Sequence, residues 1–174
     1  MDIYKIHILP DPVLREIAQP VARVDDAVRA QMDKMVTTMA EAEGIGLAAN
    51  QVGLLNRVIV VDTAKREFHE SRPIAMANPE VIWKSEEVWT YPEGCLSIPQ
   101  QFADVERPYE VRVKYLDRDG KAQEMHATGL TSTCLQHEID HLNGVLFIDY
   151  ISRLKRNMII KKFDKLHRDS GNVL

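Results

Sequence analysis

Residues 130–143 read LTSTCLQHEIDHLN, a stretch that predicts a helix closed by the glycine that follows it, Gly144. His137 and His141 stand four residues apart, so they lie on one face of this helix and both imidazoles can reach a single metal ion. Glu138 lies beside that face, where its carboxylate can contact a metal-bound water and accept its proton. A surface helix that happens to contain two histidines and an acid fits the same letters, since so short a pattern often arises by chance.

The segments on either side of this helix predict a strand hairpin before it and a second helix after it. From residue 109 to residue 115 apolar and polar side chains alternate, which is typical of a half-buried strand. Residues 117–120, DRDG, predict a turn, and residues 121–127 return as the second arm of the hairpin. Residues 151–168 predict a C-terminal helix. Its expected apolar stripe is Ile151, Leu154, Met158, Ile159 and Leu166.

The N-terminal half adds one helix and several strands. Asp25 is a good N-cap for a helix that ends before Gly44. The apolar run within residues 57–62 predicts a fully buried strand, and two shorter strands are expected around Val81 and Val88. The order of one helix, several strands and two helices indicates an α+β fold. The apolar residues at helical spacing in the first helix are Val28, Met32, Met35, Val36 and Met39.

Length and composition indicate one domain, expected to span residues 1–168 with a C-terminal tail at 169–174. The 45% hydrophobic and 28% charged residues are typical of a soluble globular protein. The net charge of -4 argues against a surface generally covered by nucleic acid, so DNA is not an expected partner, while a local basic patch stays open. The chain shows no signal-peptide pattern and no run of eighteen apolar residues, so we expect a cytoplasmic protein outside membranes. An organellar protein whose transit peptide has been removed stays open. Both cysteines, Cys95 and Cys134, are expected to be reduced.

A catalytic metal site needs a third protein ligand, and the usual downstream candidates are missing. Zinc proteases with this histidine pattern take a later glutamate or a third histidine. Here no glutamate follows Glu138, and Phe147 stands where that histidine would be. Asp149 and His167 stay open as unusual downstream ligands.

Three upstream side chains come into question as well. Cys134 shares the helix but lies about 10.5 Å along the axis from His141, too far for a metal–sulfur bond of about 2.3 Å. It is expected to be a small buried residue instead. His126, in the hairpin, is either a ligand or a hydrogen-bonded strand histidine. Cys95 follows a glycine in an expected loop, where its thiolate can face the helix.

Three separated segments resemble the three motifs of the peptide deformylases, in the order and spacing of that family: residues 44–51, GIGLAANQ; residues 93–97, EGCLS; and residues 136–141, QHEIDH. The similarity runs from residues 9–15, LPDPVLR, to the final helix. It implies an α+β fold with mixed or antiparallel β-sheets packed around a central metal-binding helix, and with a C-terminal helix. It also implies a metal-dependent hydrolase that removes the formyl group from the N-terminal formylmethionine of nascent polypeptides and releases formate.

The same resemblance implies roles for individual residues. Glu138 is the implied general base and acid. The side-chain amide of Gln51 and the backbone N–H of Leu96 are implied to stabilise the oxyanion formed when water attacks the formyl carbonyl. Ferrous iron is the implied native ion, although a cysteine and two histidines also suit zinc, nickel and cobalt. The implied metal ligands are Cys95, His137 and His141.

For the substrate, the resemblance implies that an extended peptide pairs with the backbone near Ile45 and Gly46 as an added strand. Because glycine lacks Cβ, it allows a peptide backbone to approach closely. The methionine side chain is expected in an apolar pocket that includes Ile45, Leu130 and the helix face near His137.

Three further positions follow from the resemblance. Arg107 is expected to form a salt bridge with Asp140 that fixes the helix behind the site. Residues 130–133, LTST, are more polar than is usual in relatives, which bears on how apolar the methionine pocket is. Phe102 stands where some relatives have a basic residue, so we expect no charged contact with the substrate there.

Two other classes of protein share some of these features. A zinc endopeptidase has the histidine–glutamate helix, and a non-catalytic metal-binding or ribosome-associated module binds metal without turnover. The C-terminal helix carries seven basic residues against one acid, Asp164, which is usually the solvated face of a packed helix. The resemblance suggests in addition that it docks on ribosomal RNA near the exit of the nascent chain. The basic residues are Arg153, Lys155, Arg156, Lys161, Lys162, Lys165 and Arg168.

Overall fold

The α+β arrangement is confirmed by the computed structural model, which describes residues 2–171. A five-stranded sheet has the order β1-β2-β3-β6-β7, and β4 pairs with β5 in a separate two-stranded sheet. Every pairing between these strands is antiparallel. The helices are α1 (Asp26–Glu41), α2 (Gly129–Leu142) and α3 (Arg153–Gly171); the strands are β1 (Gly46–Ala48), β2 (Val58–Val61), β3 (Ile74–Lys84), β4 (Val88–Cys95), β5 (Ile98–Pro108), β6 (Glu110–Leu116) and β7 (Ala122–Thr128).

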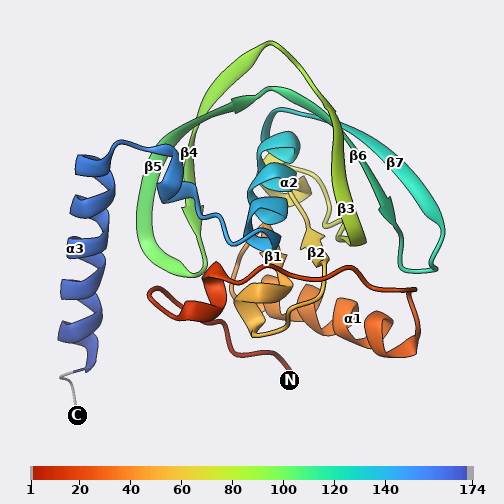
Figure 1. Ribbon diagram of the computed structural model, residues 1–174, viewed down its shortest axis with the longest axis horizontal. Coiled ribbons are helices and arrows are strands. Elements are labelled where there is room, and N and C mark those ends of the chain that lie inside the picture. The colour runs from red at the N-terminus through yellow and green to blue at the C-terminus, as the bar shows by residue number, and fades with distance from the viewer. Residues whose placement is uncertain (1, 172–174) are drawn as a thin grey trace.

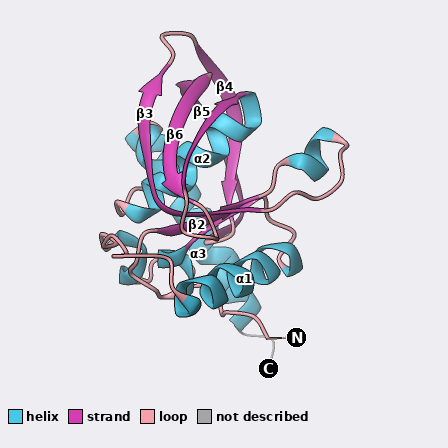
Figure 2. Cartoon of the chain, turned by 90° about the vertical axis from the view of Figure 1, so that its right-hand side faces the viewer, coloured by secondary structure: helices cyan, strands magenta, loops and turns pink. Residues whose placement is uncertain are grey.

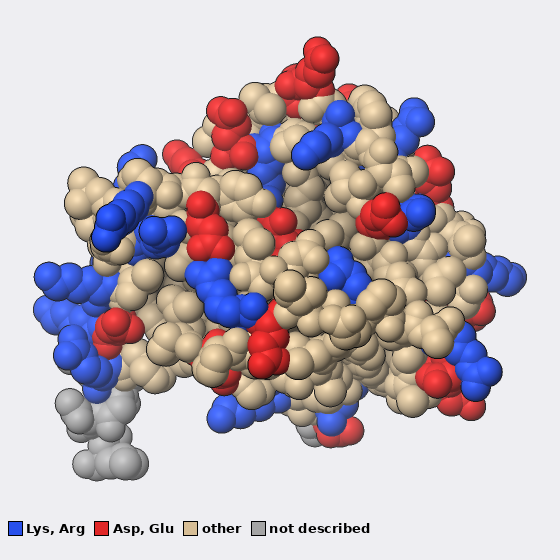
Figure 3. Space-filling view, in the orientation of Figure 1, with Lys and Arg blue, Asp and Glu red and all other residues tan. Residues whose placement is uncertain are grey.

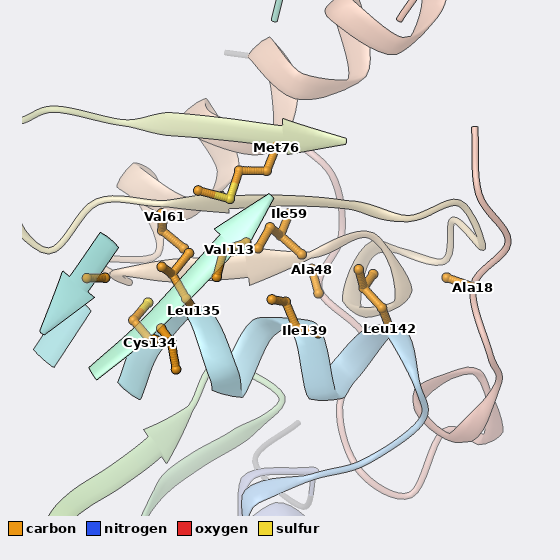
Figure 4. Packing of buried hydrophobic residues seen from close by; sticks show 12 residues of the cluster. Ala18, Ala48, Ile59, Val61, Met76, Val113, Cys134, Leu135, Ile139 and Leu142 are labelled. Carbon is orange, nitrogen blue, oxygen red and sulfur yellow. The ribbon is translucent and has the colours of Figure 1, made fainter. Parts of the chain in front are cut away.

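Helix α2 lies at the centre of the molecule, between the five-stranded sheet and the β4–β5 hairpin (Figure 1). One side of α2 packs its apolar residues against the sheet, where Leu135 and Ile139 belong to the same buried cluster as Ile59 (Figure 4). Residues at i and i+4 share a helix face, so the opposite side of α2 carries His137 and His141 towards the hairpin. The central position of α2 therefore places both histidines inside the protein.

Local sequence signals account for the elements that surround this centre. The Asp25 side chain caps α1 by accepting a hydrogen bond of 2.9 Å from the backbone N–H of Val28. The methionines of α1 are buried against β1 and β2, and Figure 2 shows α1 lying below the sheet. Asp117 closes the β6–β7 turn by accepting from two backbone N–H groups at 2.9 Å each. Gly144 follows α2 with φ of 72°, which a glycine adopts without strain.

The region between residues 74 and 108 differs from the sequence expectation. β3 and β4 are longer than the short strands expected around Val81 and Val88, and β5 was not anticipated. Alternation of apolar and polar residues fails there because β4 and β5 bury polar side chains, including Glu93 and Arg107. The expectation of a loop around Cys95 was wrong, because Cys95 is the last residue of β4 and the turn begins after it.

The C-terminal helix also differs from its prediction. Most of its expected apolar stripe faces solvent, since Leu154 and Met158 are 72% and 63% exposed. The buried contact is made by Phe163, which joins the cluster of residues under β5 together with Ile159. The helix continues to Gly171, three residues past its expected end, so the first residues of the expected C-terminal tail are helical. Residues 172–174 of that tail lie outside the described part of the chain. None of the helices within residues 2–171 has the length and apolar character needed to cross a bilayer.

Candidate active site

Three side chains with metal-binding atoms converge where the end of β4 meets α2. Nε2 of His141 lies 3.2 Å from Nε2 of His137 and 3.3 Å from Sγ of Cys95, and the three atoms all lie within 4.8 Å of one another. Among the residues that the structure describes, this is the one group of three histidine, cysteine or acidic side chains arranged in this way. A thiolate and two imidazoles form a ligand set suited to zinc or to a late first-row metal.

The other candidate ligands are engaged elsewhere. His126 pairs with Glu110 at 2.9 Å, as expected for a hydrogen-bonded strand histidine. Asp149 pairs with Arg15 at 2.6 Å, and the His167 ring stacks on Phe163 within α3. Cys134 is buried, and burial raises the pKa of its thiol well above the ordinary value, which keeps it neutral. The prediction that Cys134 is a small buried residue is thereby confirmed.

A chain of buried charges holds His137 from behind. Its Nδ1 lies 2.9 Å from Oε1 of Glu93, which leaves Nε2 facing His141. Arg107 donates to both oxygens of Glu93, at 2.6 and 3.0 Å. Hydrogen bonds from His137 and Arg107 outweigh the effect of burial and lower the pKa of Glu93, so this carboxylate stays charged inside the protein. A carboxylate behind a ligating histidine fixes its tautomer and ring orientation.

Arg107 also connects this group of buried charges to the C-terminal end of α2. Arg107 donates to Asp140 at 2.8 Å, so the expected contact between these two side chains is present. The Tyr150 hydroxyl donates to the same Asp140 oxygen at 2.8 Å, and the Arg107 guanidinium lies 4.5 Å from the centre of the Tyr150 ring. Sequence reasoning missed Glu93 and Tyr150. Glu93 lies two residues before Cys95 on β4, so a correctly predicted strand would have placed both on one face.

The two metal-facing imidazoles differ in their preference for a proton. Burial lowers the pKa of His137, but its hydrogen bonds to Cys95 and Glu93 outweigh this and raise it well above the ordinary value. Burial, together with the nearby charge of His137, lowers the pKa of His141 well below its ordinary value. His141 is therefore neutral, the form in which an imidazole binds a metal.

Glu138 lies beside the three ligand atoms, and one of its carboxylate oxygens makes no hydrogen bond. The residue is 4% exposed, its Oε1 lies 3.9 Å from Nε2 of His137, and its Oε2 has no hydrogen-bond partner. Burial raises the pKa of Glu138 to about 7, although the charge of His137 works in the opposite direction. A carboxyl group with a pKa near neutrality can both accept and return a proton. The orphaned oxygen and the converging ligands together fit a site for a metal ion and a water molecule.

Gln51 reaches the same point from the 3-10 helix at Ala49–Val52. Its side-chain N–H groups donate to Ser97 Oγ at 3.0 Å and contact Cys95 Sγ at 3.6 Å. The backbone N–H of Ala48 donates to Gln51 Oε1 at 2.9 Å, so both ends of the amide are held. Ser97 was not singled out from the sequence.

The comparisons with known proteins agree on one family. A family model described as polypeptide deformylase matches residues 3–157. A peptide deformylase of Methylocella silvestris is 61% identical over 95% of this chain and 85% of its own length, and one of Mesorhizobium japonicum is 57% identical over 98% and 97%. A crystal structure of a peptide deformylase from Legionella pneumophila superposes with a TM-score of 0.91 at 42% identity, covering 99% of this chain and 100% of that one.

The chain belongs to the peptide deformylase family. It is a metallohydrolase that removes the N-formyl group from nascent peptides, as its resemblance to this family implied. The deformylase from Ehrlichia chaffeensis, solved in complex with actinonin, is also similar, with a TM-score of 0.90 and 38% identity over 97% of this chain and 99% of that one. The zinc endopeptidase and the non-catalytic module are thereby set aside.

A cavity of about 390 Å³ opens onto the deformylase site. Ile45, Gly46 and Leu130 line it together with His137 and Glu138, so the structure brings the residues expected to bind substrate to the metal-binding cluster. Leu96, in the turn after β4, lines it as well.

The polar residues at the start of α2 are satisfied by neighbouring groups. Thr131 Oγ1 lies 2.7 Å from Thr63 Oγ1, on the side of a neighbouring cavity, and Ser132 donates to the Pro108 carbonyl. Thr133 lines the active-site cavity, but its hydroxyl accepts a hydrogen bond of 2.9 Å from the indole of Trp89. Of the three hydroxyl residues at 131–133, Thr133 is the one that lines the active-site cavity, and its hydroxyl is already engaged.

Proposed function

We propose that Cys95, His137 and His141 hold one ferrous ion and that Glu138 transfers the proton during deformylation. The observation that carries this proposal is the convergence of three ligand atoms beside a buried carboxylate oxygen with no partner. The ligand set also suits zinc, nickel and cobalt, and the resemblance to the family favours iron. Elemental analysis of protein purified without oxygen tests the metal. One iron per chain is expected, and zinc alone under those conditions would remove iron from the proposal.

The bound ion supplies positive charge that makes a water molecule more acidic and polarises the formyl carbonyl. Glu138 accepts a proton from the attacking water as the water oxygen bonds to the formyl carbon. When the C–N bond breaks, Glu138 returns this proton to the departing amine nitrogen, and formate and the free N-terminus are released. The pKa of about 7 suits Glu138 to both steps. Its unpartnered Oε2 is the atom available for this transfer.

Two donors at the edge of the cavity are proposed to stabilise the developing oxyanion. The Gln51 amide is the first, and its anchored oxygen and its bond to Ser97 fix where the amide group points. The backbone N–H of Leu96 is the second, in the turn that follows Cys95. A donor that is already oriented needs no reorganisation during the reaction, which is why such groups act strongly.

The substrate is proposed to bind as an added strand. β1 is an edge strand of the five-stranded sheet, and it borders the cavity through its first residue, Gly46, and through Ile45 just before it. An extended peptide beside it pairs through backbone hydrogen bonds, and its methionine side chain enters the cavity next to Leu130. A related deformylase from Acinetobacter baumannii has been solved with Met-Ala-Ser bound, with a TM-score of 0.80 and 34% identity over 86% of this chain and 99% of that one.

The central test replaces Glu138 with glutamine, which keeps the shape of the side chain and removes its basicity. Glu138→Gln is expected to keep the metal and to lose about 10²- to 10⁴-fold in turnover of formyl-Met-Ala-Ser. An unformylated peptide should not be cut by the wild type. Near-normal formate release by metal-loaded Glu138→Gln would remove this residue from the mechanism.

We also propose that α3 docks on ribosomal RNA. Figure 3 shows its Lys and Arg side chains gathered along one edge of the molecule, and Lys161, Lys162 and Lys165 are exposed. Exposed cations near phosphates give binding that weakens as salt rises. Changing these three lysines to glutamate should abolish pelleting with ribosomes. The matched control changes three exposed lysines elsewhere, Lys5, Lys84 and Lys121, and pelleting of the α3 variant equal to that of this control would contradict the proposal.

Two broader expectations belong to the same proposal. We take residues 1–168 as one functional domain, which the family match over residues 3–157 supports. We place the enzyme in the cytoplasm, where ribosomes expose formylated N-termini.

A further inference from the structure

Gly46, in β1, leaves a space that two side chains of α2 occupy. A Cβ built on Gly46 would lie 2.6 Å from Oε1 and 2.9 Å from Cδ of Glu138, and 2.8 Å from Sγ of Cys134. Real Cβ atoms essentially never approach other atoms within 3.0 Å. Any side chain at position 46 therefore collides with the Glu138 carboxylate and with the Cys134 sulfur at once.

The backbone itself does not require glycine at this position. Gly46 lies in regular pairing with Val61 of β2, and its φ is outside the left-handed range. Gly144, by contrast, has φ of 72°, so any other residue there is strained. The three atoms nearest to a Cβ at position 46 all belong to side chains of α2, so the obstacle to alanine there is contact with α2 and not the backbone conformation. Because alanine keeps the N–H and C=O groups, backbone pairing with a substrate strand is preserved in an alanine variant.

The Glu138 carboxylate has few other restraints. Its Oε2 makes no hydrogen bond, and its Oε1 has the long contact of 3.9 Å with His137. Close packing rather than a hydrogen bond decides where this carboxylate lies, and Gly46 and Cys134 form the wall on the Oε1 side. A carboxylate moves easily at a surface, but this one is 4% exposed, and Cys134 Sγ occupies the space beside Gly46 as well.

We propose that Gly46 is a positioning residue for the reaction: the absence of a Cβ admits the Glu138 carboxylate to the place from which it transfers the proton. This role differs from the close approach of a substrate backbone, and it rests on the proposed function of Glu138. A displacement of about 1 Å of a catalytic group can lower the rate by roughly 10²-fold. The effect on turnover is separable from binding, since the substrate-pairing groups of Gly46 are unchanged.

The test is a set of variants measured with formyl-Met-Ala-Ser. Gly46→Ala should retain one metal per chain, lower kcat by about 10- to 100-fold and leave KM within about threefold. Adding Cys134→Ala removes the sulfur, so the carboxylate regains room and kcat should recover at least about fivefold. The melting temperature should follow the same pattern. Gly46→Ala should lower the melting temperature by more in the wild-type background than in the Cys134→Ala background.

Two further comparisons separate this inference from the mechanism on which it rests. In a Glu138→Gln background, Gly46→Ala should lower kcat no further, because the group that it displaces no longer transfers a proton. If Glu138→Gln is itself near-normal, the proposed function fails. If Glu138→Gln is inactive while Gly46→Ala keeps kcat within about threefold of the wild type, Gly46 has no positioning role.

Other outcomes also decide the question. A Gly46→Ala effect confined to KM, or accompanied by loss of metal, would overturn the inference. Should Gly46→Ala fail to fold, the double variant with Cys134→Ala takes its place. Recovery of a folded, active enzyme then supports the clash as the cause, and a folded enzyme without turnover speaks against it.

Discussion

Arg107 sits inside the protein between two carboxylates, and its removal is expected to be severe. The arginine and Glu93 are 4% and 3% exposed, and they share two hydrogen bonds of 2.6 and 3.0 Å. Asp140 accepts a third bond from the same guanidinium. Arg107→Met fills most of the volume but leaves the Glu93 charge buried with only His137 as a partner. Such an uncompensated buried charge is far more costly than the loss of a surface pair.

The expected loss is about 3–5 kcal/mol in the free energy of unfolding, the range found when one partner of a buried ion pair is removed. For a chain of this length, that corresponds to a melting temperature lower by roughly 6–20 °C. Arg118→Met is the matched control, because Arg118 also donates two hydrogen bonds to one carboxylate, that of Asp33 at 2.8 Å each. Both members of that pair are more than half exposed, so water screens them and little stability should be lost.

The assay is urea unfolding of metal-free protein, with a chelator present, since a bound metal would stabilise the folded state by mass action. The sign of the pH dependence is an internal check. The pKa of Glu93 lies below its ordinary value of 4.5 in the folded state, so its contribution to stability is present above pH 4.5 and is lost as the pH falls further. The deficit of Arg107→Met should therefore be largest near neutral pH and shrink in acid.

Metal affinity gives a second measurement of the same arrangement. Because Glu93 orients His137, Arg107→Met should also weaken metal binding by roughly 10- to 100-fold. Arg118→Met should leave it unchanged. A stability loss for Arg107→Met equal to that of Arg118→Met, or a deficit that grows in acid, would refute the assigned role of this buried chain of charges.

The remaining predictions concern the ligand set, the proton acceptor and the C-terminal helix. Cys95→Ala should lose tight metal binding and deformylation together, whereas Cys134→Ala should keep the metal. Elemental analysis and formate release measure the two properties, and a Cys95→Ala variant that stays metallated and active would contradict the proposed ligand set. Cys95→Asp should be strongly impaired even when metallated, because a hard carboxylate replaces the soft thiolate; the same two measurements apply. In metal-free protein, burial raises the pKa of Glu138 to about 7 from an ordinary 4.5, so its contribution to stability is full below pH 4.5 and falls as the pH rises towards 7. Between pH 4.5 and 8, Glu138→Gln should therefore gain about 3 kcal/mol relative to the wild type in urea unfolding. A difference that stays constant with pH would contradict the shift. Phe163→Ala should weaken the packing of α3 against the rest of the protein, so proteolysis within residues 153–171 should be faster while deformylation is retained. Cleavage at the wild-type rate would show that Phe163 does not anchor the helix.

Periodic, local signals were enough to predict several elements. α1 follows from its Asp25 cap and its buried methionines, and the β6–β7 hairpin follows from alternation around a DRDG turn. α2 with its two histidines follows from helical spacing, because residues four apart share a face in any helix. The three motifs also sufficed to predict the family, which the comparisons confirmed.

Only the tertiary structure decided which distant side chains meet these histidines. Spacing along the chain left four candidates for the third ligand: Cys95, His126, Asp149 and His167. The packing of the β4–β5 hairpin against α2 brings Cys95 to the two histidines. β5 escaped prediction because it buries the polar side chain of Gln101 and the charged side chain of Arg107, and a pattern based on apolar burial cannot register them. The buried face of α3 was wrongly predicted for a related reason: its apolar residues are spread around the helix, and docking beneath β5 selects among them. Local periodicity is a property of one segment, whereas ligand convergence, buried charge pairs and docking faces are contacts between segments that only the folded chain brings together.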